Sequence, residues 1–240
     1  MPWFGIRAFS SFLFALGVLL TSCSGGTTHD ACGLVLAVDG SLTIADQRGP
    51  ANPVGPGSGF CAGAVLHTSA SASAQIACFA NTLVHLLGET DFELDRLTLR
   101  RDGNETADEV EGRKIHCRLP AGLIYLSHLR PWGSSELIIV TPHGTLTASS
   151  DCLIRVRVDD RRIRITSARG NCSFQPASGQ SAVAVEAGFL CEWPSAEPGP
   201  VIAANEAAGQ QEIAELIAAE QRLNALAVTL RSAPPPWARR

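Results

Sequence analysis

The sequence has little of several residue types on which molecular recognition commonly depends. Its 240 residues contain 19 Lys and Arg against 23 Asp and Glu, which gives a formal net charge of −4. Nucleic-acid-binding proteins usually carry a clustered basic surface, so no nucleic-acid partner is expected. Aromatic residues make up only 6% of the chain, with a single Tyr. A groove that stacks sugar rings on aromatic side chains would therefore have few residues to build it.

Sequence motifs for cofactors, metals and catalysis are also missing. The chain has no Walker sequence, no dinucleotide fingerprint and no Cys-x-x-Cys pair, so neither a cofactor nor a metal is expected. His143 is followed by Ser149, Ser150 and Asp151, but a Ser/His/Asp triad is defined by geometry that this spacing does not fix. We therefore assign no catalytic residues and expect a protein that is not an enzyme.

Three acidic residues alternate along one predicted strand. Asp91, Glu93 and Asp95 would place their carboxylates on the same face, where they could bind a hard cation. Charged side chains also keep edge strands from aggregating. We favour this second interpretation, a solvated strand edge.

The first 22 residues have the layout of a secretory signal peptide. Arg7 supplies a positive charge, and residues 8–20 are apolar apart from two serines. This run is short for a membrane span and leads directly into a small polar segment. Leu20-Thr21-Ser22-Cys23 resembles a bacterial lipobox, in which the Cys becomes the lipidated first residue, although an ordinary secretory signal is the alternative. We expect an exported lipoprotein of the bacterial cell envelope, facing the periplasm or the cell surface and anchored in a membrane through Cys23.

The rest of the chain divides into a tether, a β-domain, a linker, a helix and a tail. Residues 23–32 form a flexible tether, and residues 33–192 contain short apolar runs with a period of two, separated by turn residues. This pattern predicts an all-β domain of many short strands. Asp39-Gly40 predicts a tight hairpin, and Asp159-Asp160 joins two strands in which Arg alternates with Ile and Val. Both of these strands are expected to be half exposed.

A Pro-rich linker at 193–203 precedes a predicted amphipathic helix at 204–231, and residues 232–240 are expected to be a disordered tail. Asn205 is a candidate N-cap of the helix. Apolar residues recur at helical spacing, namely Ile213, Leu216, Ile217, Leu223, Leu226 and Leu230. This stripe is expected to cover the β-domain, a second copy of the chain through self-association of residues 204–230, or another protein.

Eight cysteines are many for a cytosolic protein and fit an oxidising compartment. If Cys23 carries lipid, seven remain, so at least one is free or bonded to another chain. Cys152 and Cys172 flank the predicted hairpin at 159–161 and are candidates for one disulfide. Cys61 and Cys78 are placed similarly around a turn at 69–73 and are candidates for a second. The connectivity cannot be deduced from sequence alone.

The order of the strand motifs resembles a known family. The motifs lie at 33–40, 53–57, 63–68, 75–77, 137–146, 167–170 and 187–188, and they include the turn Thr141-Pro142-His143-Gly144. In this order they resemble a FecR domain, the periplasmic β-module of iron-siderophore sigma regulators, which also occurs in many other exported proteins. The resemblance covers residues 33–191 and implies a β-roll, a solenoid-like fold or a sandwich.

These observations favour a non-enzymatic, lipid-anchored envelope protein whose FecR-like domain binds or scaffolds another envelope component, either a protein or a glycan. One alternative is an envelope signalling subunit related to the sigma regulators. Those regulators carry an anti-sigma segment before a membrane helix, and the signal peptide takes that place here, so direct contact with a sigma factor is not expected. An undetected hydrolase is the other alternative.

Overall fold

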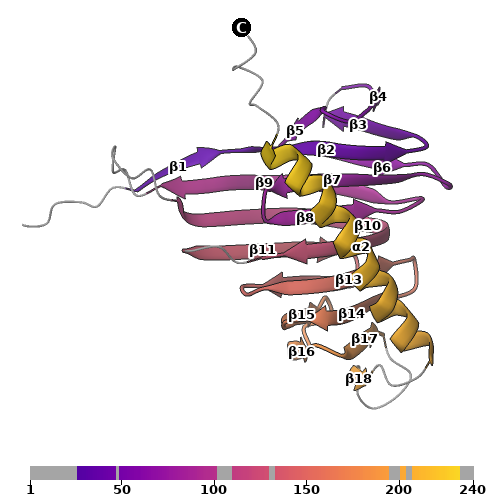
Figure 1. The fold of residues 1–240 in the computed structure, drawn as a ribbon. Helices are drawn as coiled ribbons and strands as arrows, with labels where there is room; N and C mark the ends of the chain where they lie inside the picture. Colours follow the sequence, from indigo (N-terminus) through magenta and orange to yellow (C-terminus); the bar gives the residue numbers. More distant parts are fainter. Residues whose placement is uncertain are drawn as a thin grey trace, which may run out of the picture.

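Two β-sheets that share one long strand form the body of the protein (Figure 1). The computed structural model describes residues 26–46, 49–101, 110–129, 133–194, 201–203 and 207–232. Strand β10 (Val110–His128) pairs through residues 112–118 with strands of the first sheet and through residues 122–128 with strands of the second. The expected all-β fold with one C-terminal helix is confirmed.

The first sheet extends to both sides of the N-terminal half of β10. Its strands are, in spatial order, β4 (Asn52–Val54), β3 (Leu42–Asp46), β6 (Ala64–Thr68), β9 (Asp91–Arg101), β10, β11 (Ser134–Thr141), β12 (Gly144–Ala148), β15 (Cys172–Pro176) and β16 (Val183–Val185). The short strand β1 (Thr27–Asp30) pairs with β9 beyond the end of β6. The pairing of β10 with β11 is parallel.

The second sheet is built around the C-terminal half of β10. Its strands are, in spatial order, β5 (Gly59–Cys61), β2 (Cys32–Asp39), β7 (Ser73–Phe79), β8 (Thr82–Leu86), β10, β13 (Cys152–Val158), β14 (Ile163–Arg169), β17 (Phe189–Trp193) and β18 (Val201–Ala203). All of these pairings are antiparallel. The strands thus progress along the stack roughly in chain order, as the colour sequence in Figure 1 shows.

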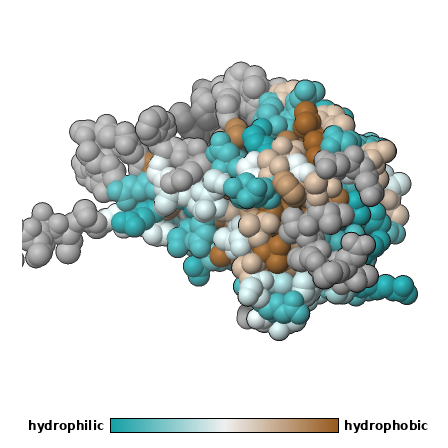
Figure 2. Space-filling view, turned by 90° about the horizontal axis from the view of Figure 1, so that it is seen from below, coloured by the Kyte–Doolittle hydropathy of each residue, from teal (hydrophilic) through white to brown (hydrophobic). Residues whose placement is uncertain are grey.

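One hydrophobic core lies between the two sheets and follows directly from the period-two pattern. Ile154 and Val156 of β13 and Ile165 of β14 are fully buried and belong to the same cluster as Leu137 and Ile139 of β11. Burying each such side chain stabilises the fold by roughly 1.5–3 kcal/mol. Seen from the β18 end, polar and apolar groups are interspersed over the surface (Figure 2).

The predicted hairpin at Asp39-Gly40 is wrong. Strand β2 belongs to the second sheet and β3 to the first, so this turn carries the chain from one sheet to the other instead of joining paired strands. Gly40 has a φ of +84°, and a Cβ there would lie 2.8 Å from that of Ala72. The hairpin at Asp159-Asp160 does form, since Val158 pairs with Ile163.

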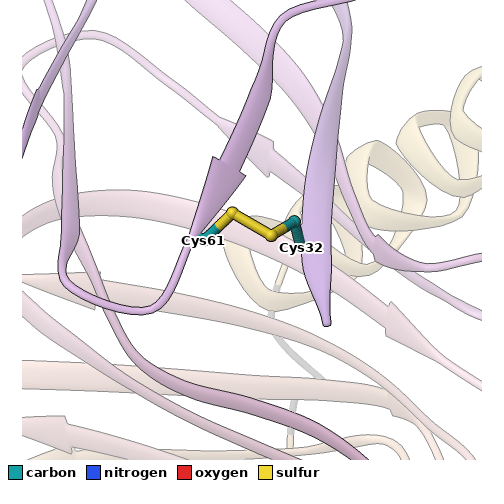
Figure 3. The surroundings of a disulfide bond; sticks show 2 residues. All are labelled: Cys32 and Cys61. Carbon is teal, nitrogen blue, oxygen red and sulfur yellow. A yellow bond between two sulfur atoms is a disulfide. The ribbon is translucent and has the colours of Figure 1, made fainter. Parts of the chain in front are cut away.

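Both predicted disulfide pairings are also wrong, because neither pair lies across a hairpin. The structure joins Cys61 to Cys32, which are directly opposite each other on β5 and β2 with a Cα–Cα distance of 4.3 Å (Figure 3). Cys78 is buried as a free thiol. Cys152 and Cys172 are free as well, because the chain changes sheets after β14 and places them on opposite sheets of the core.

Helix α2 (Ala207–Ser232) runs diagonally over the outer face of the second sheet, from β14 back towards β2 (Figure 1). Leu216, Ala219 and Leu223 are completely buried against the sheet, whereas Ile217 is 43% exposed. The helix therefore covers its own β-domain with a narrower stripe than the sequence predicts. No helix in the described part of the chain has the length and hydropathy needed to cross a membrane.

Several expectations concern residues outside the described part of the chain. These are the signal peptide, the lipidation site Cys23, the N-cap Asn205, the linker residues 195–200 and the tail at 233–240.

Candidate functional site beneath the C-terminal helix

The outer face of the second sheet carries a concentration of arginine side chains. Ile154 and Val156 point into the core, so Arg155 and Arg157, between and after them on β13, point to the outer face. Arg164 of β14 is directly opposite Arg157 in the ladder. Like charges in this arrangement destabilise a sheet. The face therefore needs carboxylates to compensate them.

Glu212 of α2 supplies one of these carboxylates. Its Oε1 lies 3.3 Å from Nη1 of Arg155 and 3.2 Å from Nε of Arg164. Its Oε2 accepts a hydrogen bond of 2.7 Å from the hydroxyl of Thr166. Only 8% of the Arg155 side chain and 16% of the Glu212 side chain are exposed. At this depth each charge would be costly without its partner, so Glu212 and Arg155 depend on each other.

Glu220 forms a second contact, two turns further along the helix. Its carboxylate accepts two hydrogen bonds from the guanidinium of Arg169, at 2.6 and 3.0 Å, and one of 2.8 Å from the hydroxyl of Ser127. Burial alone would raise the pKa of Glu220. The hydrogen bonds from Arg169 and Ser127, together with the guanidinium charge, outweigh burial and hold its pKa below the ordinary value. The same pairing raises the pKa of Arg169.

A cavity of about 90 Å³ opens beside the Glu212 contact. It is lined by Arg155, Arg157, Asp159, Arg162, Arg164 and Glu212. The Asp159 carboxylate accepts hydrogen bonds of 3.0 Å from the backbone amides of Arg161 and Arg162. These bonds lower the pKa of Asp159, and so does the charge of nearby arginines. Its carboxylate therefore stays ionised and holds the turn in place.

Several nitrogen atoms around this cavity lack hydrogen-bond acceptors. Nε and Nη1 of Arg155 and Nε of Arg164 are buried and have no hydrogen-bond partner within the described structure. Nη1 of Arg155 and Nε of Arg164 are within ion-pair distance of Glu212, but their N–H groups are not aligned with its oxygen. Buried donors without acceptors are rare in native proteins, which makes this cavity the main candidate site of the molecule.

A buried serine and histidine form a contact at another place in the structure. The hydroxyl of Ser135 lies 2.9 Å from Nε2 of His128, and the hydroxyl of Thr82 lies 2.8 Å from Nδ1. Burial lowers the pKa of His128, which favours the neutral form of its ring. The contact joins a nucleophile to a base, but Nδ1 faces a hydroxyl where a catalytic triad has a carboxylate. It also satisfies the polar groups of an imidazole that is fully buried.

The turn predicted from the family motif joins β11 to β12. The hydroxyl of Thr141 donates to the carbonyl of Gly144 at 2.8 Å, and a Cβ at Gly144 would lie 2.3 Å from the carbonyl oxygen of Gln175. Nε2 of His143 lies 2.7 Å from the carbonyl oxygen of Asp159, so the ring donates to the β13–β14 turn. Pro142 is exposed. These contacts hold neighbouring turns together.

The predicted acidic stripe lies on the first sheet. β9 is an interior strand, so the interpretation of the stripe as a sheet edge is wrong. The guanidinium of Arg118 contacts Asp95 at 2.6 Å and Glu93 at 3.2 Å, and His67 contacts Asp91 at 2.7 Å. Over the described residues, no group of His, Cys, Asp and Glu side chains is arranged to hold a metal ion.

The sequence indicated the arginine-bearing strands but not the site that they form. The alternation in 153–158 places the arginines on one face, but the expectation that this strand is half exposed is wrong at Arg155, which Glu212 of the helix covers. The signal that could have predicted the site is on the helix, where Glu212 and Glu220 lie on the side that carries Leu216 and Leu223. Acidic residues beside a buried helical stripe indicate cations beneath it.

Comparisons with known proteins give only weak similarity. No protein-family model and no curated protein matches the sequence. Two crystal structures of a candidate anti-sigma factor from Parabacteroides distasonis ATCC 8503, at 1.65 and 2.50 Å resolution, match with 13% identity and a TM-score of 0.39. The match covers 57% of this chain and 57% of each solved chain, so this protein spans little more than half of their length. Similarity at this level assigns no function.

Proposed function

We propose that this protein is a non-enzymatic, lipid-anchored component of the bacterial cell envelope whose FecR-like β-domain binds another envelope component. The observation that carries the proposal is the Cys32–Cys61 disulfide, which lies at the exposed end of β2 and β5 (Figure 3). Disulfides persist in oxidising compartments and are rare in the cytosol. This bond supports the export that the signal peptide and the lipobox-like sequence predict.

The site beneath α2 supports a binding role. Arg157 is exposed at the mouth of the cavity and has no ion-pair partner within the described residues. A β-sheet and a docked helix hold the surrounding guanidinium groups in place. Rigid, partly unsatisfied donors are a feature of ligand sites, because little ordering is needed when the ligand arrives.

Lipid anchoring is tested by fractionation and mass spectrometry of the full chain. The wild-type protein should partition into detergent and carry acyl chains on an N-terminal Cys23. The Cys23→Ala variant should lose the acyl mass and leave the membrane fraction. A wild-type protein that is water-soluble after export, with another N-terminal residue, would show that the lipoprotein assignment is wrong.

Binding to an envelope component is tested by photo-crosslinking in intact cells. A photoreactive amino acid at position 157 places the probe at the cavity mouth, and the same probe at the exposed Asp39 of β2 serves as the matched control. A discrete adduct at position 157 but not at position 39 is the expected result. Identical adduct patterns at both positions, or none at either, would count against a binding role for this face.

The hydrolase alternative has one observation in its favour, the contact between Ser135 and His128. A screen with ester, amide and phosphoester substrates should detect no turnover beyond that of a Ser135→Ala variant. Turnover that disappears in Ser135→Ala would replace the proposed function with an enzymatic one. Because Ser135 is only 6% exposed, folding of the variant must be verified by circular dichroism.

A further inference from the structure

The cavity beside Glu212 contains more positive charge than its carboxylates neutralise. Four guanidinium groups line it, from Arg155, Arg157, Arg162 and Arg164, together with only two carboxylates. A third carboxylate, Glu192, reaches Arg162 and Arg164 from outside the lining, at 2.5 and 3.3 Å. The arginines still outnumber the carboxylates. The excess charge attracts an anion into the cavity.

The hydrogen-bond donors around the cavity indicate the same class of ligand. Arg155 is more than nine-tenths buried, and its Nε and Nη1 have no hydrogen-bond partner within the described structure. Nε of Arg164, on the neighbouring strand, is also buried without a hydrogen-bond partner, although 27% of that side chain is exposed. Guanidinium groups present planar forks of N–H donors that match the oxygens of carboxylate and phosphate. An oxyanion would accept hydrogen bonds from these N–H groups, two of which Glu212 pairs only by charge.

The size and shape of the cavity restrict the ligand further. A cavity of about 90 Å³ is several times the 10–15 Å³ or so that one water molecule needs, yet it is small for a drug-sized ligand. The donors come from two strands and a turn, so they approach from different directions. A phosphate offers at least three acceptor oxygens and about −1.5 to −2 charges, whereas a carboxylate offers two oxygens and one charge. Glu212 already supplies one carboxylate to Arg155 and Arg164.

We propose that this cavity binds a phosphate group, which the guanidinium groups of Arg155, Arg157 and Arg164 hold beside Glu212. The phosphate is carried either by a small soluble molecule or by the headgroup of a lipid, since both present the same oxygens. The inference rests on the proposed binding role and names its ligand chemistry. It does not depend on the lipid anchor, so the two proposals can fail separately.

Calorimetric titration of the purified full chain in detergent with inorganic phosphate tests the proposal. Wild-type protein should bind one phosphate saturably, and acetate should bind more weakly. Arg157→Gln should weaken phosphate binding by at least about tenfold, as expected for the loss of one charge-assisted hydrogen bond. Arg161→Gln is the matched control, because it removes the same charge from the exposed turn that follows β13 but lies outside the cavity lining, and it should change the affinity less than twofold.

A second variant is expected to change the phosphate affinity in the opposite direction. Glu212→Gln removes a negative charge from the lining but can still accept the hydrogen bond from Thr166, so it should bind phosphate more tightly than the wild type. A lowered melting temperature of Glu212→Gln would reveal that the helix docks less stably in this variant. Three outcomes overturn the proposal: no saturable phosphate binding, acetate binding as tight as phosphate binding, or equal losses in Arg157→Gln and Arg161→Gln.

The two sources of the phosphate are distinguished by competition. Glycerol 3-phosphate represents a soluble phosphomonoester, and vesicles of phosphatidylcholine containing phosphatidic acid represent a lipid headgroup. Competition by glycerol 3-phosphate alone supports a soluble ligand. Sedimentation of the wild type, but not of Arg157→Gln, with the acidic vesicles supports a lipid. If neither competes with inorganic phosphate, the assignment of the cavity to a phosphate monoester is wrong.

Discussion

At the scale of single residues, carboxylates make the contact between the helix and the sheet specific. Glu212 and Glu220 each accept bonds from an arginine or hydroxyl that the second sheet presents. Hydrogen bonds in which the donor or the acceptor is ionised are roughly twice as strong as neutral ones, and they are directional. These two residues therefore fix the position of the helix along the sheet, which apolar contacts alone would leave free to slide.

The lowered pKa of Glu220 makes helix docking sensitive to acid. Because the pKa is lower in the folded than in the unfolded state, the carboxylate stabilises the fold above its ordinary pKa of about 4.5. This contribution is lost as the pH falls through the lower, folded-state pKa. The melting temperature of the wild type should therefore decrease below pH 4.5, whereas Glu220→Gln should start lower at pH 7 and decrease less steeply.

Glu215 provides the control for this prediction. Its carboxylate is exposed and lies 3.5 Å from the hydroxyl of Tyr125, with no guanidinium within ion-pair distance in the described structure. Glu215→Gln should retain the pH profile of the wild type, measured by differential scanning calorimetry between pH 3 and 7. Parallel profiles for the wild type and Glu220→Gln would show that the Arg169 contact contributes nothing at neutral pH.

At the scale of secondary-structure elements, α2 is held by a narrow apolar seam with charged contacts beside it. Leu216 packs with Tyr125 and Leu153, and Leu223 packs with Ala77 and Leu83. The seam crosses four consecutive strands of the second sheet, β13, β10, β8 and β7, so one helix also connects strands that are not directly paired, such as β7 and β13.

The seam can be tested with two adjacent residues of the helix. Leu216→Asp places an unpaired charge in a site with no exposure and should destabilise the fold by about 3–5 kcal/mol. Ile217→Asp introduces the same charge at a position that is 43% exposed and should cost less than about 1 kcal/mol. Urea denaturation followed by circular dichroism measures both. Equal losses of stability would mean that the helix does not dock in the observed orientation.

The elements were more predictable than the connections between them. Period-two runs identified the strands, and residues such as Leu216 and Leu223 identified the helix. Sequence could not show which turns join paired strands and which carry the chain between sheets, because Asp39-Gly40 and Asp159-Asp160 both have turn chemistry. That distinction depends on whether the apolar faces of the flanking strands pack against each other across the core. The disulfide pairing depends on this distinction, and the arginine cavity depends on where the helix docks, so the sequence predicts neither.

At the scale of the whole molecule, the Cys32–Cys61 bond acts mainly through the unfolded chain. It closes a loop with a sequence separation of 29 residues, and removing the conformational freedom of such a loop is worth about 3.6 kcal/mol. Cys61→Ser should therefore lower the free energy of unfolding by about this amount. Cys32→Ser should do the same, and the double variant should lose no more than either single one.

Reduction of the wild type provides an independent check of this bond. A thiol reductant should lower the denaturant midpoint of the wild type to that of Cys61→Ser and leave the variant unchanged. The five buried thiols, which are free in the structure, should react with a thiol reagent only after unfolding. Rapid labelling of any of them in the native protein would contradict the described core.

The direction of α2 has a consequence for how the molecule is assembled. The helix is synthesised after every described strand, yet its Leu223 packs beside Leu36 of β2, one of the earliest strands. Contacts between such distant parts of a chain form late and slow the folding of the whole domain. Until the helix arrives, Leu83, Tyr125 and Leu153 remain open to solvent and to other chains. The nascent protein is therefore most vulnerable to aggregation just before the helix docks, and a chaperone that shields this face would act at that stage.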